Sequence, residues 1–256
     1  MRFRPCIDLH GGQVKQIVGS TLSDDQSSSL KTNFASDKSP LFYAEMYKRD
    51  GLVGGHVIKL GSGNDQAALE ALQAYPGGLQ VGGGINAKNA AYWLDQGASH
   101  VIITSYVFEK GRVREDRLLE VLQAVGKGRL VLDLSCRKKG GKYYVVTDRW
   151  QNFTDMEVNG ETLKYFAKFC DEFLVHAVDV EGKCSGIEQE LAVNLGKWTT
   201  LPTTYAGGIQ SMNDMYLIKE LGAGKLDATI GSALDIFGGN GVTYTDAVAF
   251  DKAERS

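Results

Sequence analysis

Three short motifs occur twice in this chain, and the two copies of each motif are separated by almost the same number of residues. Asp8 in CIDLHGG is matched by Asp133 in VLDLSCRKKGG, 125 residues later. The other two pairs are 83–85 (GGI) with 207–209 (GGI), 124 residues later, and 103–105 (ITS) with 230–232 (IGS), 127 residues later. Because each separation is nearly half of the 256 residues, the sequence predicts two copies of one structural unit without a linker between them.

Eight short apolar runs of strand type alternate with eight amphipathic runs of helical type. The predicted strands are 3–8, 56–60, 79–81, 100–104, 129–134, 172–178, 201–206 and 226–230. The predicted helices are 41–50, 65–75, 86–97, 114–125, 159–171, 186–196, 211–222 and 243–254. Asn86, Asn159 and Ser211 are typical N-caps, and Gly97 and Gly222 are typical helix stops.

This alternation predicts an α/β fold. Eight β/α units in 256 residues fit a single (β/α)8 TIM barrel, one domain over residues 1–256, and the duplication predicts that it is built from two duplicated half-barrels of four units each. A doubly wound parallel sheet is the alternative architecture. It gives no reason for matched motifs at equivalent strand ends, so we expect the barrel.

The composition limits the kinds of partner. The formal net charge is -3 at pH 7, which disfavours general binding to nucleic acid or to an anionic membrane. No apolar run approaches the roughly 20 residues of a membrane span, and the four cysteines form no CxxC pair. No leader precedes the first predicted strand, so we expect a cytoplasmic protein, a monomer that binds a small molecule.

The repeated glycines and hydroxyl residues are candidates for phosphate binding. They follow predicted strands at the end where barrels of this kind build their ligand sites. Glycine lets backbone N–H groups approach an anion closely, and a hydroxyl adds a donor. Tight turns alone are the alternative, but the duplication favours one phosphate in each half. The candidate residues are Gly83, Gly84, Thr104 and Ser105 in the first half, and Gly207, Gly208, Gly231 and Ser232 in the second.

Asp8 and Asp133 are the candidate catalytic residues. They end the first and fifth predicted strands, which lie opposite each other in an eight-stranded ring, so we expect them to face one cavity from two sides. Two carboxylates across a cleft suit proton removal and donation. Turn capping is the alternative for each, and metal binding for the pair. No HxH, HExxH or clustered-carboxylate spacing completes a ligand set, so we predict no metal and no cofactor.

The segment after the fifth predicted strand is long for a loop and has the alternation of a small hairpin over the site. Arg149 and Trp150 lie near its return and are candidates for substrate binding, Trp150 by stacking on a planar substrate, with packing as the alternative. His176 lies near the end of the sixth predicted strand and is a candidate to line the site. We interpret His10, His56 and His100 as structural, and residues 19–40 as a mobile lid or a tolerated insertion.

Several motifs together resemble one known family. CIDLHGGQVKQIVG, HVIKLG, VGGGI, VLDLSCRKK, RWQ, YAGGI and IGSALD are similar to the eukaryotic-type isomerases of the histidine-biosynthesis half-barrel family, over about residues 3–237. The resemblance implies an Amadori rearrangement of phosphoribosyl-formimino-aminoimidazole-carboxamide ribotide, an aminoaldose with a phosphate at each end, without metal or cofactor. It implies that Asp133 is the general acid that helps open the ribose ring and Asp8 the general base, and that Trp150 covers the substrate.

One residue assignment stays open, because Ser135 competes with Asp133 in the comparison with bacterial members.

Two other functions also remain open on the sequence alone. The sister imidazole-glycerol-phosphate cyclase shares the fold and both aspartates, but carries a lysine eight residues after the first aspartate. Here that position is Gln16 and the lysine is Lys15, which lies on the opposite face if the segment is extended. We therefore favour the isomerase. A non-catalytic bis-phosphate binder is the third alternative, which the intact aspartate pair disfavours.

Overall fold

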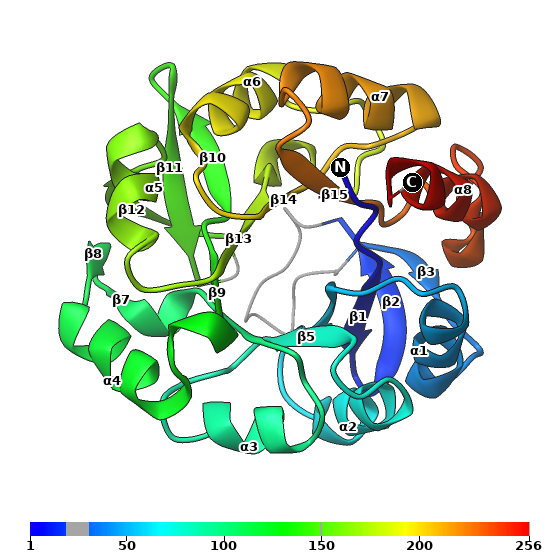
Figure 1. Cartoon of the computed structure of the whole chain (residues 1–256), viewed down its shortest axis with the longest axis horizontal. Helices are drawn as coiled ribbons and strands as arrows, with labels where there is room; N and C mark the ends of the chain where they lie inside the picture. The colour runs from blue at the N-terminus through cyan, green and yellow to red at the C-terminus, as the bar shows by residue number, and fades with distance from the viewer. Residues whose placement is uncertain (19–30, 149, 256) are drawn as a thin grey trace.

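A closed barrel of parallel strands forms the centre of the computed structural model, which describes residues 1–18, 31–148 and 150–255. Within these ranges, eight strands follow one another in parallel around the barrel (Figure 1). They are β1 (Cys6–His10), β4 (Gly55–Lys59), β5 (Leu79–Gly82), β6 (Val101–Ile103), β9 (Leu130–Asp133), β13 (Glu172–His176), β14 (Thr203–Ala206) and β15 (Leu226–Thr229). A parallel bridge between Phe3 and Ala228 closes the ring, and the predicted (β/α)8 TIM-barrel fold is confirmed.

The α-helices of the described ranges surround the barrel (Figure 1). They are α1 (Pro40–Arg49), α2 (Asp65–Ala74), α3 (Ala90–Asp95), α4 (Glu115–Val125), α5 (Gly160–Phe166), α6 (Gln189–Trp198), α7 (Met212–Leu221) and α8 (Tyr244–Arg255). Short 3-10 helices are η2 (Ser105–Val107), η3 (Lys127–Arg129), η4 (Val178–Val180) and η5 (Asp235–Phe237). None of the helices in the described part of the chain is long and apolar enough to cross a membrane.

Local capping explains where several helices begin and end. The Asn159 side chain accepts a hydrogen bond from the backbone of α5, and Ser211 forms a capping box with Asp214 at the start of α7, as predicted. Asn86 has the contacts of an N-cap, as predicted: its side chain accepts from the Lys88 N–H, its carbonyl accepts from the Ala90 N–H, and Asn89 Oδ1 accepts from the Asn86 N–H. The residues that it caps first form a turn, however, and regular α3 begins only at Ala90, so the helix predicted over 86–97 starts later than expected.

Two other predicted boundaries differ from the structure. Strand β1 continues two residues past Asp8, because the chain turns there and pairs with β2 in an antiparallel hairpin. Asp8 therefore lies within β1 and not at its end. The helix predicted over 159–171 ends at Phe166, since a tighter turn with a bond from Phe169 N–H to the Phe166 carbonyl follows it.

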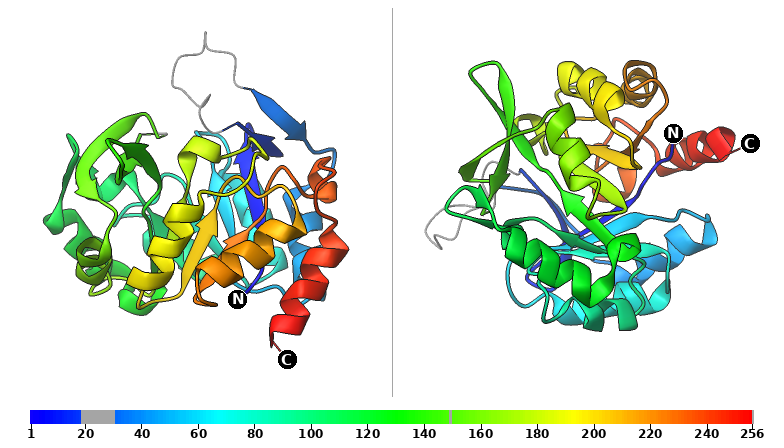
Figure 2. Two further views of the ribbon diagram at one scale, coloured as in Figure 1. Left: turned by 90° about the horizontal axis from the view of Figure 1, so that it is seen from above. Right: turned by 60° about the vertical axis from the view of Figure 1, so that its left-hand side comes forward.

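Accessory strands extend the barrel at the carboxyl ends of β1 and β9. Strands β2 (Gln13–Ile17) and β3 (Thr32–Ala35) continue from β1, and β7 (Phe108–Glu109) pairs with β8 (Arg112–Val113). Strands β10 (Cys136–Lys139), β11 (Lys142–Thr147) and β12 (Asn152–Glu157) form a separate sheet, which confirms and enlarges the predicted hairpin. Figure 2 (left) shows β3 and the β10–β12 sheet on the side of the barrel away from both termini.

The expectation of one structureless segment over 19–40 is wrong for its described part. Residues 32–35 form β3, which is paired antiparallel with β2, and α1 begins at Pro40. Pairing with β2 gives backbone groups of these polar residues the partners that a free loop would lack. Residues 19–30, the remainder of the predicted lid, lie outside the described residues.

The interior of the barrel is apolar in the middle and polar above it. A cluster of Ile58, Ile102, Val131, Leu174 and Ala206 fills the central layer. Asp8 is the register partner of Ile58 and lies on the same face of the sheet. Asp133 follows Val131 by two residues, so alternation places it on the interior face as well. Asp133 is likewise the register partner of Leu174, so both carboxylates lie on the interior face of the barrel beside this apolar cluster.

Candidate active site

A large cavity opens at the carboxyl ends of β4, β5, β6 and β9 and has a volume of about 780 Å³. All four phosphate candidates of the first half line it, together with Asp133 and Trp150. The residues concerned are Gly83, Gly84, Thr104, Ser105, Asp133 and Trp150. We call Gly83, Gly84, Thr104 and Ser105 the first glycine–hydroxyl set, and Gly207, Gly208, Gly231 and Ser232 the second. The first set and the catalytic candidate Asp133 thus line the same cavity.

A smaller cavity lies next to β1 and β13, with a volume of about 30 Å³, and is lined by the second set. Its lining includes Asp8, His56, His176, Glu181, Gly207, Gly208, Gly231 and Ser232. Among the described residues, Asp8 and Asp133 therefore line two adjoining cavities, where the sequence predicted one. His176 lies at the boundary, because it lines the smaller cavity while its ring is near Asp133 and Trp150, which line the larger one.

Glycine is required at equivalent positions of the two repeated turns. Gly83 has φ +87, and an added Cβ would overlap the carbonyl of Lys59 at the end of the preceding strand. Gly207 has φ +113, and an added Cβ would lie 2.8 Å from the carbonyl oxygen of Ala177. Both turns thus bring backbone close to the neighbouring strand end, where a side chain would not fit. The tight-turn interpretation holds at these two positions, whether or not an anion binds beside them.

The two repeated serines are each contacted by an accessory segment of the other half. The backbone N–H of Asp148, between β11 and β12, donates to Ser105 Oγ at 3.1 Å. The side chain of Asn33, in β3, donates to Ser232 Oγ at 3.0 Å and to the carbonyl of Gly182 at 2.9 Å. Neither Asn33 nor Asp148 was predicted from the sequence, since neither belongs to a motif. Each serine is therefore hydrogen-bonded to an accessory segment that belongs to the other half of the barrel.

Asp133, Ser135 and His176 form a buried hydrogen-bonded group. Asp133 Oδ1 accepts from the Ser135 N–H at 2.8 Å and from the Ser135 hydroxyl at 2.6 Å. His176 Nδ1 lies 3.7 Å from the same oxygen and 3.2 Å from Ser135 Oγ. Burial would raise the pKa of Asp133, but His176 and Ser135 outweigh it and hold that pKa below its usual value. Asp133 is therefore an ionised carboxylate at neutral pH.

Asp8 has a different environment. Gln16 Nε2 donates to Asp8 Oδ2 at 3.0 Å. Desolvation and the nearby Glu181 carboxylate raise the pKa of Asp8 to about 7, while His176 and Gln16 act in the opposite direction. A carboxylate with this pKa exchanges protons readily near neutral pH. The environments of the two aspartates thus set their pKa values apart, which is typical of acid–base pairs.

Of the remaining candidates, Trp150 and His176 lie next to each other in the structure. Trp150 has a left-handed backbone with φ +65, and its ring centroid is 5.6 Å from that of His176. Arg149, the other candidate of this segment, lies outside the described residues. His56, interpreted from sequence as structural, lines the smaller cavity, and burial with the nearby His176 lowers its pKa to about 3. Glu181 was missed, because it follows a short 3-10 helix and belongs to no repeated motif.

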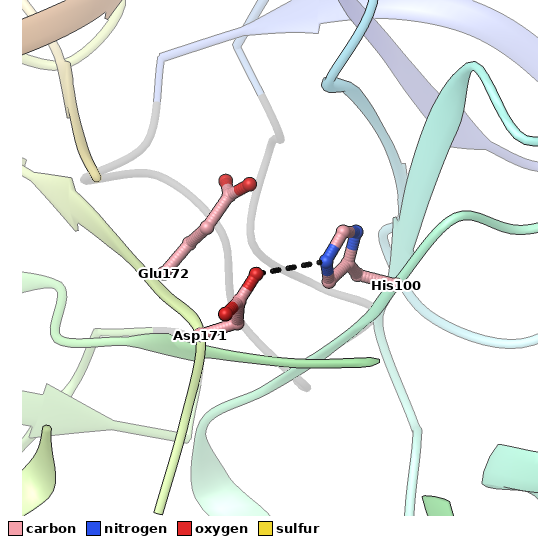
Figure 3. A group of neighbouring side chains, drawn as sticks. All are labelled: His100, Asp171 and Glu172. Carbon is pink, nitrogen blue, oxygen red and sulfur yellow. Dashed lines mark ion pairs between the residues drawn. The ribbon is translucent and has the colours of Figure 1, made fainter. Parts of the chain in front are cut away.

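A cluster with metal-ligand spacing lies at the opposite end of the barrel, and it is the one such group among the described residues (Figure 3). His100 Nε2 is 3.4 Å from Asp171 Oδ2, and Glu172 accepts from Gln80 at 2.8 Å. The Arg4 guanidinium lies 3.9 Å from Glu172. These ion pairs and hydrogen bonds account for the cluster without a metal, and the neighbouring guanidinium disfavours a second cation.

Fold and site together define a class: a duplicated (β/α)8 barrel in which each half brings a glycine turn, a hydroxyl residue and an inward-facing aspartate to the carboxyl ends of its strands. The family described as Histidine biosynthesis protein matches residues 2–240, and the chain belongs to this family. This confirms the resemblance inferred from the motifs.

Curated relatives cover the whole chain. One is the chloroplastic 1-(5-phosphoribosyl)-5-((5-phosphoribosylamino)methylideneamino)imidazole-4-carboxamide isomerase of Medicago truncatula, 56% identical over 100% of this chain and 83% of its own length. The isomerase of the same name from Yarrowia lipolytica is 52% identical over 98% of both chains. That from Saccharomyces cerevisiae is 48% identical over 99% of both chains.

Proposed function

We propose that this chain is the aldose–ketose isomerase of histidine biosynthesis that converts phosphoribosyl-formimino-aminoimidazole-carboxamide ribotide to its ribulosyl form. The observation that carries the proposal is that each of the two aspartates lines a cavity together with the glycine and hydroxyl residues of one repeat. A substrate with a phosphate at each end and a reacting sugar needs two anion sites flanking an acid–base pair. The names of the relatives agree with this assignment.

In the proposed reaction, the two aspartates act on opposite sides of the sugar. A proton delivered from the Asp133 side to the ring oxygen allows the ring to open and an imine to form. Asp8, with a pKa raised to about 7, then removes the proton from the carbon next to the imine. The resulting enaminol becomes the aminoketose when the anomeric carbon is protonated. The enaminol hydroxyl loses its proton in the same step, and because each bond change is driven by proton transfer within the site, the proposed reaction uses neither metal nor cofactor.

The remaining assignments complete the proposal. One phosphate binds at Gly83, Gly84, Thr104 and Ser105, and the other at Gly207, Gly208, Gly231 and Ser232. Trp150 stacks on the aminoimidazole, and Arg149 and His176 contact the substrate. The protein acts in the cytoplasm as a single-domain monomer over residues 1–256, without nucleic acid or membrane as a partner.

Gln16 favours the isomerase over the cyclase. Its side chain donates to Asp8 at 3.0 Å, so the position eight residues after Asp8 faces the candidate base with a neutral amide. Lys15 lies on the other face of β2, because successive side chains of a strand alternate. A cyclase-type lysine is therefore absent from the position beside Asp8.

The experiment is incubation of the purified protein with the bis-phosphate aminoaldose and, in a second reaction, with the corresponding aminoketose and ammonia, followed by identification of the products. We expect the aminoketose from the first reaction and no cleavage of the ketose in the second. An imidazole-glycerol phosphate product in the second reaction would identify a cyclase, and binding without turnover in both would identify a non-catalytic bis-phosphate binder. Asp8→Asn should lower kcat by about 10²–10⁴-fold and abolish solvent deuterium exchange next to the imine, because the amide cannot take up the proton. Undiminished exchange in that variant would remove Asp8 from the proposal.

A further inference from the structure

His176 is surrounded by carboxylates from three separate parts of the chain. Asp133, at the end of β9, lies 3.7 Å from its Nδ1. Asp8 in β1 and Glu181 after η4 line the same small cavity as His176. The other titratable ring packed against it is His56 in β4, at a centroid distance of 6.2 Å. One imidazole thus faces three acidic groups and one neutral histidine in the interior of the barrel.

The contacts of Asp133 make it a hydrogen-bond acceptor. One carboxylate oxygen already accepts both the N–H and the hydroxyl of Ser135, at 2.8 and 2.6 Å, and faces the His176 ring as well. Hydrogen bonds of this kind stabilise the ionised form, and an ionised carboxylate has no proton to donate. The acid side of the proposed isomerisation therefore requires a proton donor other than the Asp133 carboxyl group.

We propose that His176 is the catalytic proton donor on the acid side of this isomerisation, and that Asp133 and Ser135 are positioning residues that hold its ring. This inference rests on the function proposed above and changes which atom carries the proton. With Nδ1 turned towards Asp133 and Ser135, Nε2 is the ring nitrogen available to a sugar placed beside the cavity that His176 lines. The Trp150 ring, in the β11–β12 turn, has its centroid 5.6 Å from that of His176 and lines the adjoining larger cavity.

The charge on His176 agrees with this role. Burial alone would lower the pKa of His176, but Asp133, Glu181 and Asp8 raise it to about 9. The ring is therefore protonated at neutral pH. An imidazolium beside an aspartate at one end and a substrate at the other is an established arrangement for proton transfer.

The proton transfers balance over one turnover. The Nε2 proton of His176 passes to the ribose ring oxygen as the bond between that oxygen and the anomeric carbon breaks, and the lone pair of the exocyclic nitrogen forms the iminium. Asp8 takes the proton from the adjacent carbon, and the electrons of that C–H bond form the enaminol. The neutral imidazole then accepts the enaminol hydroxyl proton while Asp8 returns its proton to the anomeric carbon. The ketose is released with both groups restored.

The first test compares His176→Gln with the matched control His100→Gln, measured with the bis-phosphate aminoaldose. We expect H176Q to lose about 10²–10⁴-fold in kcat, while KM changes only a few-fold. H100Q alters a histidine at the opposite end of the barrel and should keep the wild-type kcat. The wild-type rate should fall above about pH 9 as His176 loses its proton, and this alkaline limb should be missing in H176Q.

The second test is the pH–rate profile of Asp133→Asn, which distinguishes His176 from Asp133 as the proton donor even if H176Q does not fold. If His176 donates the proton, D133N keeps a donor with a lower pKa, and its alkaline limb moves from about 9 towards the ordinary histidine value of about 6.5. Asp133 acting as the donor itself would leave D133N without any such shifted limb, and that result overturns the inference. An H176Q enzyme with near-normal kcat also overturns it. Failure of the wild-type enzyme to isomerise the substrate instead overturns the proposed function.

Discussion

The repeated glycine turns give a sharp test of how the two halves differ. Gly84 and Gly208 occupy equivalent positions of the duplication, with φ values of +69 and +79. A Cβ added at Gly84 would meet nothing within 4 Å. A Cβ added at Gly208 would overlap the carbonyl of Gly186 and lie 2.8 Å from Val180, because the segment after β13 folds back over this turn. The same substitution should therefore have different effects at the two positions.

The magnitudes follow from these two environments. Gly84→Ala should destabilise by about 1 kcal/mol, from the left-handed backbone alone. Gly208→Ala carries the same backbone penalty and adds overpacking against backbone, which costs about 1–3 kcal/mol. At roughly 2–4 °C per kcal/mol for a chain of this size, the Tm of G208A should lie about 2–12 °C below that of G84A.

Thermal unfolding followed by circular dichroism measures the difference, and urea unfolding provides an independent free energy. Both variants add the same methyl group, at equivalent positions of the two halves, so each serves as the control for the other. Equal Tm values for G84A and G208A would refute the reasoning, because they would mean that the segment after β13 does not pack against Gly208 in solution.

Three further predictions concern the reaction. Asp8 must be ionised to act as the base, and its pKa is raised to about 7, so kcat/KM should fall about tenfold per pH unit below that value. A flat pH–rate profile from pH 5 to 8 would argue against Asp8 as the base. Gln16→Leu removes a donor that lowers the pKa of Asp8, so this acidic limb should move to higher pH, and an unmoved limb would contradict the role of the contact. Asn33→Ala removes the bond to Ser232 Oγ and should raise KM several-fold with little change in kcat, which steady-state kinetics can check; a loss confined to kcat would count against Asn33 as a binding residue.

Several features of this chain could be predicted because they depend on residues close together in sequence. Alternating apolar periods define strands and helices, and the capping of Asn159 and Ser211 uses groups within three residues. The predicted start of α3 was too early because the residues that Asn86 caps form a tighter turn, closed by a bond from Asn89 N–H to the Asn86 carbonyl, before the regular helix begins at Ala90. The duplication also extended prediction to long range, because two matched halves imply matched positions in the closed barrel.

The sequence by itself determined the barrel, its two halves, the glycine–hydroxyl sets and the interior position of Asp8 and Asp133. Only the tertiary structure decided which groups surround each aspartate. Ser135 and His176 meet Asp133, whereas Gln16 and Glu181 meet Asp8. These contacts set opposite pKa shifts on two carboxylates that look alike in sequence. The physical reason is that a pKa depends on burial and on charges a few ångströms away, and the barrel brings those charges from strands that lie far apart in the chain.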